Sequence, residues 1–452
     1  MARSLATRLA EEHAAVAGSL PERVVARQRR DEAMQILSTR GLPTPRDENW
    51  KYPNLRLLDR VRFAPLDAAA GRKASAAGPQ APAAVSADLP APLGGYARYT
   101  FVDGLFVPGL SAGPSPAGIS VEPLAGPPSQ QTGHAIRLPS AALLRSAPDL
   151  RFALLNEAFA PDGISIRVAA HTDCPGCIEL VFVASSDAQA AASYPRIELQ
   201  VAAGARVGLV ERHVSAGSDS SFVNSVVSID IGADAVVNHY RVQQLAAKAL
   251  WFDTVAATLQ RGSTYNLRSV NHGAASARST IHVQLNGEHA AAGIYNASIG
   301  DRYQIEDTYA LVEHAAPNTR SEQTFRGISA DNARVAFNGK VVVRKEAQGT
   351  DSKQSLRGLL AGAEAEIDVR PQLEIYTDDV RCSHGATAGK LDENMLFYLL
   401  SRGLEPATAQ RLLKWAFLED VVAKIEVPEL RRQIEQSLAG RLQDAAELKE
   451  LL

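Results

Sequence analysis

The segment Val226-Val227-Ser228-Ile229-Asp230-Ile231, followed by Gly232-Ala233-Asp234, decides the fold of this chain. Its apolar and polar residues alternate, as they do in a strand whose side chains point to opposite faces in turn. Two further segments repeat the pattern, Ile197-Glu198-Leu199-Gln200-Val201 and Thr280-Ile281-His282-Val283-Gln284-Leu285. Residues 164–388 are therefore predicted to be rich in short strands.

Turn-forming residues separate these strands at a recurring interval. Gly204, Gly232, Gly262 and Gly287 lie 28, 30 and 25 residues apart, and turns near residues 300, 330 and 362 follow at 30 and 32. A turn that recurs at such an interval indicates a solenoid, in which each coil buries its inner face on its neighbours. An array of β-sandwiches is the alternative that fits the same strands.

Helical segments are predicted on both sides of this region. Residues 1–60 form an N-terminal helical domain, in which Gly41-Leu42-Pro43-Thr44-Pro45 stops the second helix. Residues 61–163 are a connection rich in Ala, Pro and Gly, with scattered strands. Residues 389–452 form a C-terminal helical domain, with helix starts at Leu391-Asp392, at Glu405-Pro406 and after Pro428.

Composition excludes several classes of function. The net charge of −3 gives no electrostatic reason to expect a nucleic-acid or membrane partner, and no apolar run approaches the roughly 18 residues of a membrane helix. Three cysteines form no disulfide framework, so we expect a reducing, cytoplasmic location. The sequence contains no GxxxxGK[ST], HExxH or GxSxG motif, so it predicts neither an ATPase of the P-loop type nor an enzyme with a visible nucleophile and base.

The first motif with possible chemistry is Cys174-Pro175-Gly176-Cys177. Two thiolates at this spacing can hold zinc or iron, or can form a redox disulfide. A closed zinc site needs four ligands, and His171 would supply only a third. The favoured interpretation is two cysteines at a turn that leads into a strand, and a CxxC metal or redox protein is an alternative function.

The second motif contains Cys382 and His384, which follow a predicted strand at 373–380. If that strand continues, Glu374, Asp378, Cys382 and His384 share one face. Thiolate and imidazole suit iron and zinc, but one Cys and one His do not complete a four-coordinate site, so further ligands would come from a partner chain. On spacing alone, a buried Cys382 and a structural, hydrogen-bonding His384 are favoured.

The surrounding sequence carries a run of specific motifs. They are His314-Ala315-Ala316-Pro317-Asn318-Thr319, Phe337-Asn338-Gly339-Lys340, Ala347-Gln348-Gly349-Thr350-Asp351, Pro371-Gln372-Leu373-Glu374-Ile375-Tyr376 and Cys382-Ser383-His384-Gly385-Ala386-Thr387. In this order they resemble the SufB/SufD family of iron–sulfur cluster assembly proteins. The match is dense from residue 310 to 425, and Asn49-Trp50-Lys51-Tyr52 resembles the entry segment of the SufD type.

Gly385 decides the branch, because SufB-type chains carry Glu after this histidine and SufD-type chains carry Gly. The resemblance implies a mainly β fold, a right-handed parallel β-helix (solenoid) core flanked by N-terminal and C-terminal α-helical domains. It implies a non-catalytic scaffold that pairs with a SufB-like subunit and docks a SufC-like ATPase. A nascent iron–sulfur cluster would be shared transiently with SufB, and this chain alone would bind none stably.

The resemblance also implies the site residues. His384, and with it Cys382, would lie in an inter-subunit cluster-assembly site. Leu412, Trp415 and Phe417 are candidates for the helix that docks the ATPase, although an apolar helical stripe is also typical of an internal core.

A β-helix enzyme that acts on carbohydrates, usually a secreted protein, is a further alternative function. Such an enzyme needs carboxylates that converge on one face. Asp378 and Asp379 would point to opposite faces of a strand, which argues against this class.

Overall fold

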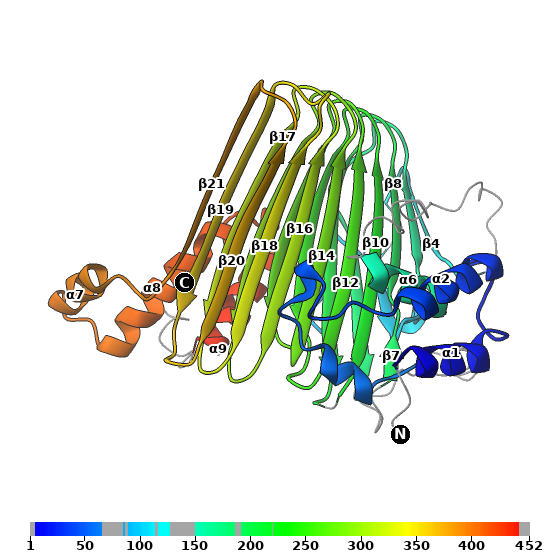
Figure 1. Cartoon of the computed structure of the whole chain (residues 1–452), viewed down its shortest axis with the longest axis horizontal. Coiled ribbons are helices and arrows are strands. Elements are labelled where there is room, and N and C mark those ends of the chain that lie inside the picture. Colours follow the sequence, from blue (N-terminus) through cyan, green and yellow to red (C-terminus); the bar gives the residue numbers. More distant parts are fainter. Residues whose placement is uncertain are drawn as a thin grey trace.

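The computed structural model describes residues 5–65, 85, 89–113, 116–126, 150–185, 191–218 and 220–442. Its centre is a helix of parallel strands, shown in Figure 1. From β8 onward, consecutive strands alternate between two sheets, so each coil adds one strand to each sheet. The predicted mainly β fold with a parallel β-helix core is therefore confirmed, and an array of β-sandwiches is excluded.

The first sheet, sheet A, holds β4 (Ile119–Pro123), β5 (Ile164–Val168), β8 (Arg196–Val201), β10 (Phe222–Ile231), β12 (Leu250–Leu259), β14 (Ser276–Leu285), β16 (Ile305–His314), β18 (Arg334–Val343) and β20 (Glu366–Ile375), with β1 (Arg62–Pro65) and β7 (Ala191–Ser193) to the side. The second, sheet B, holds β2 (Ala97–Val102), β3 (Leu105–Phe106), β6 (Asp173–Ser185), β9 (Arg206–Ala216), β11 (Val236–Gln244), β13 (Thr264–His272), β15 (Ala291–Gly300), β17 (Arg320–Ser329), β19 (Thr350–Leu360) and β21 (Val380–Gly389).

The corner after each sheet A strand from β5 to β18 has a repeating backbone conformation. One residue there adopts a left-handed conformation, with φ of 66° at Gly262, 62° at His289, 57° at Asn318 and 71° at Gly349. Its N–H donates to a carbonyl of the next coil, as from Gly349 to Asp379 at 2.8 Å. Glycine and asparagine tolerate this conformation best, which is why predicted turn residues such as Gly262 recur at the interval of the coil.

The interior has an apolar part and a polar part. The apolar side chains form one continuous core from β2 to β19. Between β9, β11 and β12 lies a buried ionic cluster, in which Arg241 Nε is 2.9 Å from Glu211 and Arg241 Nη1 is 2.7 Å from Asp253. Burial alone would raise the pKa of the Glu211 carboxyl. Contacts with Arg241, His213 and His239 lower that pKa by more, so it lies well below its ordinary value. The cluster therefore keeps a buried carboxylate charged by surrounding it with donors.

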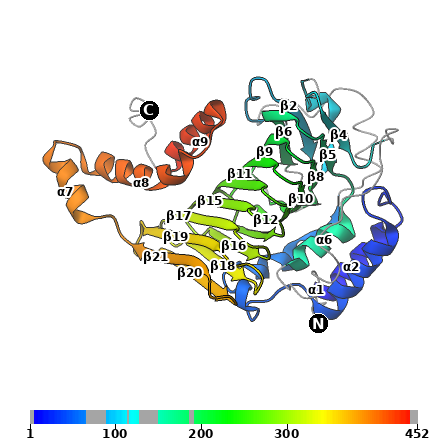
Figure 2. The ribbon, with the colours of Figure 1, turned by 90° about the horizontal axis from the view of Figure 1, so that it is seen from above.

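Helices cover the outer faces of both sheets (Figure 2). On sheet A lie α1 (Leu5–Val16), α2 (Arg27–Arg40) and α6 (Arg151–Phe159), with the 3-10 helices η1 (Glu48–Trp50) and η2 (Leu55–Arg60) in the segment after α2. On sheet B lie α8 (Pro406–Val422) and α9 (Pro428–Arg441), while α7 (Glu393–Ser401) extends beyond the last strands and η3 (Pro108–Leu110) follows β3. The predicted helix starts at Asp392, Pro406 and Pro428 agree with these bounds. No helix in the described ranges is long and apolar enough to cross a membrane.

The predicted Ala-, Pro- and Gly-rich connection at 61–163 is only partly described. Its described parts supply β1 to β4 and α6, and residues 66–84, 86–88, 114–115 and 127–149 lie outside the described residues.

Polar contacts fix α8 and α9 to sheet B. The ion pairs are Arg326–Asp420, Arg268–Glu426 and Arg441–Asp301, at 2.8, 3.0 and 2.8 Å. The buried His272 of β13 lies 3.1 Å, through Nε2, from the Ser437 hydroxyl of α9. Burial lowers the pKa of His272 to about 3, so this imidazole is neutral at physiological pH.

Replacing Arg241 by methionine should destabilise the chain by roughly 3–5 kcal/mol, because two buried carboxylates lose their cation. The free energy of unfolding in urea measures this. Arg206→Met is the matched control: its partner Asp173 and Arg206 itself are 72% and 63% exposed. An exposed pair contributes about 1 kcal/mol or less, so equal losses in the two variants would contradict the expectation.

The pH dependence of stability should report His272. The unfolded state binds a proton on this residue below pH 6.5 and the folded state does so only near pH 3, so stability falls as pH drops between these values. His272→Gln should reduce that slope by about 1.4 kcal/mol per pH unit, measured by urea unfolding between pH 6 and 4. His289→Gln, at a 63% exposed position, is the matched control, and an unchanged slope in His272→Gln would refute the expectation.

Candidate functional site

The β-helix ends in an open coil. In the described part of the chain no strand follows β20 or β21 in either sheet. The inner side chains of this coil, among them Ile367, Val369, Leu373 and Cys382, are only partly buried against the preceding coil. Every residue of β21 is exposed or half-buried, whereas in β18 most residues are buried. The end of the core is therefore accessible.

Cys382 and His384 lie on the inner side of β21. The register pairs Cys382 with Ser352 and His384 with Gln354 of β19, whose side chains are buried inside the β-helix. Cys382 is half-buried and His384 is exposed. Burial raises the pKa of the Cys382 thiol more than the Ser352 backbone lowers it, so the thiol is protonated at neutral pH.

The predicted carboxylates do not join this pair. β20 ends at Ile375 and β21 begins at Val380 in the other sheet, so the expected continuous strand is wrong. Glu374 faces outward and pairs with Lys340 at 2.7 Å, and Asp378 lies in the turn between the strands. Among the described residues, no group of three or more His, Cys, Asp or Glu side chains is arranged to hold a metal ion.

Two polar columns lie behind the pair, and sequence reasoning missed them. His314 Nε2 is 2.8 Å from the Ser321 hydroxyl, which is 2.8 Å from the hydroxyl of Ser352. Gln354 donates to Gln323 at 3.0 Å, while its own side-chain oxygen is buried without a partner among the described residues. Burial lowers the pKa of His314 to about 4. The spacing of these residues was the available signal, because Ser321 and Gln323 each stand 31 residues, or one coil, before Ser352 and Gln354.

The two edges of the open coil differ in their hydrogen-bonding groups. Glu366 donates its N–H to Ala333 and Tyr376 donates to Val343, so the even-numbered amides of β20 face β18 and the odd-numbered positions face the open edge. At the open edge Pro371 has no N–H to offer. β21 contains no proline, so its edge can pair with a further strand more completely than the β20 edge can.

The same parity places the backbone of the candidate residues. Asp351 of β19 donates back to Thr319 at 3.0 Å, and it is in register with Arg381. Arg381 therefore faces β19, and the N–H groups of Cys382 and His384 face the open edge. Each of these two residues thus presents both a side chain and a backbone amide at the end of the molecule.

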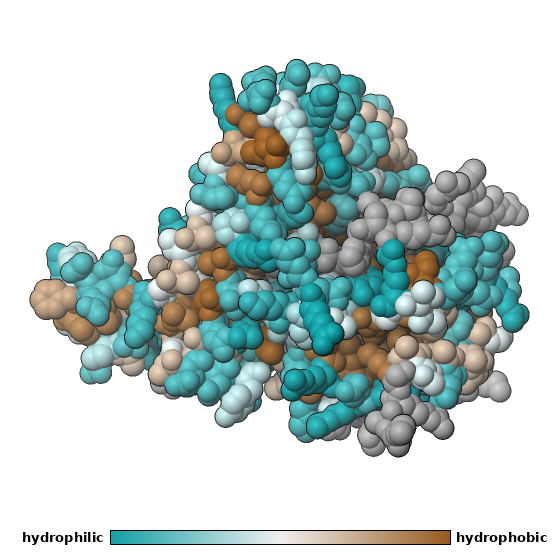
Figure 3. Space-filling view, in the orientation of Figure 1, coloured by the Kyte–Doolittle hydropathy of each residue, from teal (hydrophilic) through white to brown (hydrophobic). Residues whose placement is uncertain are grey.

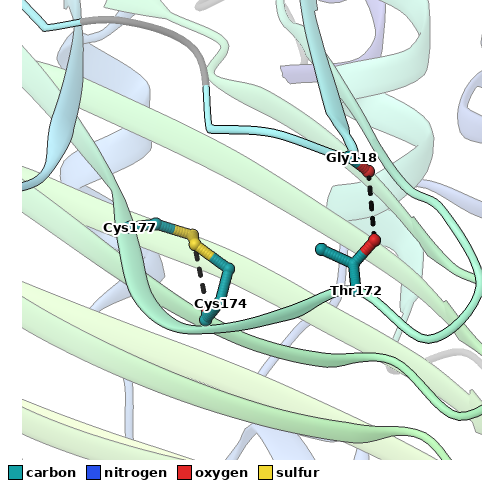
Figure 4. The surroundings of a disulfide bond; sticks show 4 residues. All are labelled: Gly118, Thr172, Cys174 and Cys177. Atoms are coloured by element: carbon teal, nitrogen blue, oxygen red, sulfur yellow. Dashed lines mark hydrogen bonds between the residues drawn. A yellow bond between two sulfur atoms is a disulfide. The ribbon is translucent and has the colours of Figure 1, made fainter.

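The other cysteine pair is remote from this end. Cys174 and Cys177 lie in β6 rather than at a turn, which corrects the prediction, and they are joined in a disulfide (Figure 4). Pro175 and its neighbours bulge toward β9, where a Cβ on Gly208 would lie 1.8 Å from the Pro175 carbonyl oxygen. Because β6 lies near the opposite end of sheet B from β21, this pair is no part of the same site.

The helix α7 carries a second candidate surface. Its first turn is capped by the Asp392 carboxylate, which accepts the N–H of Asn394 and of Met395. Met395, Phe397 and Tyr398 are 60, 72 and 55% exposed. The space-filling view in Figure 3 shows apolar side chains on this projecting helix, at the left. Several large apolar side chains gathered on one short helix are typical of a protein–protein contact.

The residues predicted for docking lie on α8 and differ in exposure. Trp415 is 7% exposed and belongs to the core between α8, α9 and sheet B. Leu412 is half-buried, and so is Phe417, which packs against the same core. Sequence periodicity placed all three on one helix, but the most exposed apolar side chains of the arm are on α7.

Comparisons with known proteins agree on one family. The family model described as "SUF system FeS cluster assembly, SufBD core domain" matches residues 182–417. The chain is 29% identical over 419 residues to the iron-sulfur cluster assembly protein SufD of Escherichia coli K12, which covers 93% of each chain. It is 28% identical over 448 residues to an iron-sulfur cluster assembly SufBD family protein of Synechocystis, covering 95% of this chain and 94% of that one.

Proposed function

Because this chain belongs to the SufB/SufD family of iron–sulfur cluster assembly proteins, as a member of the SufD type, we propose that it is a non-catalytic scaffold subunit in the cytoplasm. In this proposal it pairs with a SufB-like subunit through the open coil and carries a SufC-like ATPase on its C-terminal helical unit, residues 389–452. In the same proposal the other structural units of the chain are the N-terminal helical domain (1–60), the Ala-, Pro- and Gly-rich connection (61–163) and the β-helix core (164–388). The open, uncapped coil is the observation that carries the proposal.

The open coil suits a partner of the same architecture. It exposes partly buried apolar side chains and an unpaired strand edge, and a second strand at β21 would satisfy the edge while covering the core. An uncovered edge is a liability that proteins usually block. Here Pro371 interrupts one edge and leaves the other free, which directs pairing to β21.

Cys382 and His384 supply one side of a shared cluster-assembly site in this proposal. Iron and sulfide are the cargo, and thiolate and imidazole are ligands that iron accepts. Two residues leave an iron ion with too few ligands, so the SufB-like partner supplies the others. Because two ligands hold an iron ion weakly, this chain alone would not bind the cluster stably, which supports transient sharing.

The exposed apolar side chains of α7 support the ATPase contact. α8 and α9 are fixed to sheet B by ion pairs, whereas α7 contacts α8 and extends from the body. We include Phe417 and Leu412 of α8 at the border of this surface, and we assign the buried Trp415 a supporting role beneath it.

Two variants of β21 should separate pairing from cluster chemistry when this chain, a SufB-like subunit and a SufC-like ATPase are expressed together. Ala386→Pro removes an N–H from the open edge and should abolish co-purification of the SufB-like subunit. His384→Ala keeps the edge, so the complex should assemble, while the cluster yield in cells falls by roughly tenfold.

Ala386→Ser, which retains the N–H, is the control for pairing. If the Ala386→Pro variant still co-purifies with the SufB-like subunit, the edge that pairs with this subunit is not β21. A normal cluster yield in His384→Ala would remove this residue from the site.

A substitution on α7 should release the ATPase. Phe397→Ser should weaken SufC-like binding by roughly thirtyfold, the effect of losing an apolar anchor, without changing SufB-like pairing. Titration calorimetry with the purified subunits measures both. Tyr303→Ser, at an 81% exposed corner, is the matched control. If the Phe417→Ser variant loses the ATPase while the Phe397→Ser variant binds it normally, the docking surface lies on α8 instead.

A further inference from the structure

The segment that follows α2 lies on the outer face of sheet A. Trp50 anchors it: the indole is 1% exposed and stacks on Phe152 of α6, with ring centroids 5.1 Å apart. The guanidinium of Arg278 in β14 lies 4.4 Å from the Trp50 ring centroid, and Arg278 pairs with the buried Asp307 of β16. A buried cation held between an aromatic face and a carboxylate fixes the position of this segment.

From this anchor the segment reaches the last coils. Asn49 accepts a hydrogen bond of 3.0 Å from Asn338 of β18. Glu48 forms an ion pair with Arg370 of β20. The segment therefore extends from the middle of sheet A to its terminal strand, and Figure 1 shows this part of the chain, in blue, across the strands of sheet A.

Tyr52 makes the second contact with β20. Burial raises the pKa of its hydroxyl, and so does the negative charge of Asp368 in β20. The guanidinium of Arg334 lies 5.8 Å from the Tyr52 ring centroid and pairs with Asp368 at 3.5 Å. Tyr52, Arg334 and Asp368 thus join the N-terminal segment, β18 and β20 in one cluster.

β20 needs support that the inner strands do not need. It bonds to a strand on one side only, and its residues are half-buried or exposed along its whole length. The ion pair between Glu48 and Arg370 is largely exposed, at 67 and 41%, and such pairs contribute little. Tyr52 makes the more effective contact, because its ring lies against the Arg334 guanidinium of β18, which in turn pairs with Asp368 of β20.

We infer that residues 48–52 brace the terminal coil, and that Tyr52 is a positioning residue for the edge at which a partner subunit binds. The brace holds β20 in register on β18, and β20 in turn holds the coil that presents β21. The N-terminal end of the chain thereby determines the geometry of the far end of the β-helix. The partner-binding part of this inference rests on the proposed function, whereas the brace itself does not.

Amide hydrogen exchange on the full chain, read by mass spectrometry, tests the brace. The amides of β20 that bond to β18, from Glu366 to Glu374 at even positions, should exchange roughly fivefold faster in Tyr52→Ala, because the cation–π contact between Arg334 and the Tyr52 ring is lost. The amides of β12 and β14 should be unchanged. Tyr52→Phe, which keeps the ring, should give a smaller increase, and it replaces Tyr52→Ala if that variant does not fold.

Arg46→Ala is the matched control, since this exposed side chain lies just before the segment. It should leave β20 exchange unchanged. Unchanged β20 exchange in folded Tyr52→Ala and Tyr52→Phe overturns the brace.

Binding measurements test the positioning role. Tyr52→Ala should weaken binding of the SufB-like subunit several-fold and leave SufC-like binding intact. Faster β20 exchange with unchanged SufB-like affinity overturns the positioning role. If the unsubstituted chain does not bind a SufB-like subunit at all, the proposed function fails instead, and the exchange experiment still decides whether the brace exists.

Discussion

The parallel pairing of successive coils is the constraint on which the rest of the structure depends. Each parallel strand shares its backbone hydrogen bonds with the strands one coil before and one coil after it. An inner coil is therefore complete only when its neighbours are in place, and its interior side chains are covered by the same neighbours. The repeated left-handed corner residues, such as Asn318 and Gly349, keep every coil in the same register.

The outer faces of the two sheets are used in different ways. On sheet A the contacts of the N-terminal segment are aromatic and partly buried, with Trp50 at their centre. On sheet B the helices α8 and α9 are attached by charged pairs at the rim of a small apolar core. Both attachments leave the open edge of β21 and the helix α7 uncovered, and these are the two surfaces that the proposed function gives to partner subunits.

Much of this architecture could be predicted from the sequence, and the exceptions have physical causes. Strand alternation and the spacing of turns such as Gly262 determine the coil, and Asp392 and Pro406 mark helix starts, because these are local effects. The strand before Cys382 was extended too far, since periodicity does not show where a chain bends into the other sheet. An apolar stripe also does not reveal what covers it, so Trp415 could not be distinguished from an exposed docking residue.

Pro371 has a consequence for the solubility of the free subunit. A β-helix with two open edges at one end is a template on which copies of the same chain can stack, and such stacking leads to fibres. A missing N–H in the middle of the β20 edge interrupts the hydrogen-bonded ladder that fibre growth would require, while the β21 edge, which is equally long, contains no proline. The proline is thus a gatekeeper residue, which opposes self-association of the chain at this end of the β-helix.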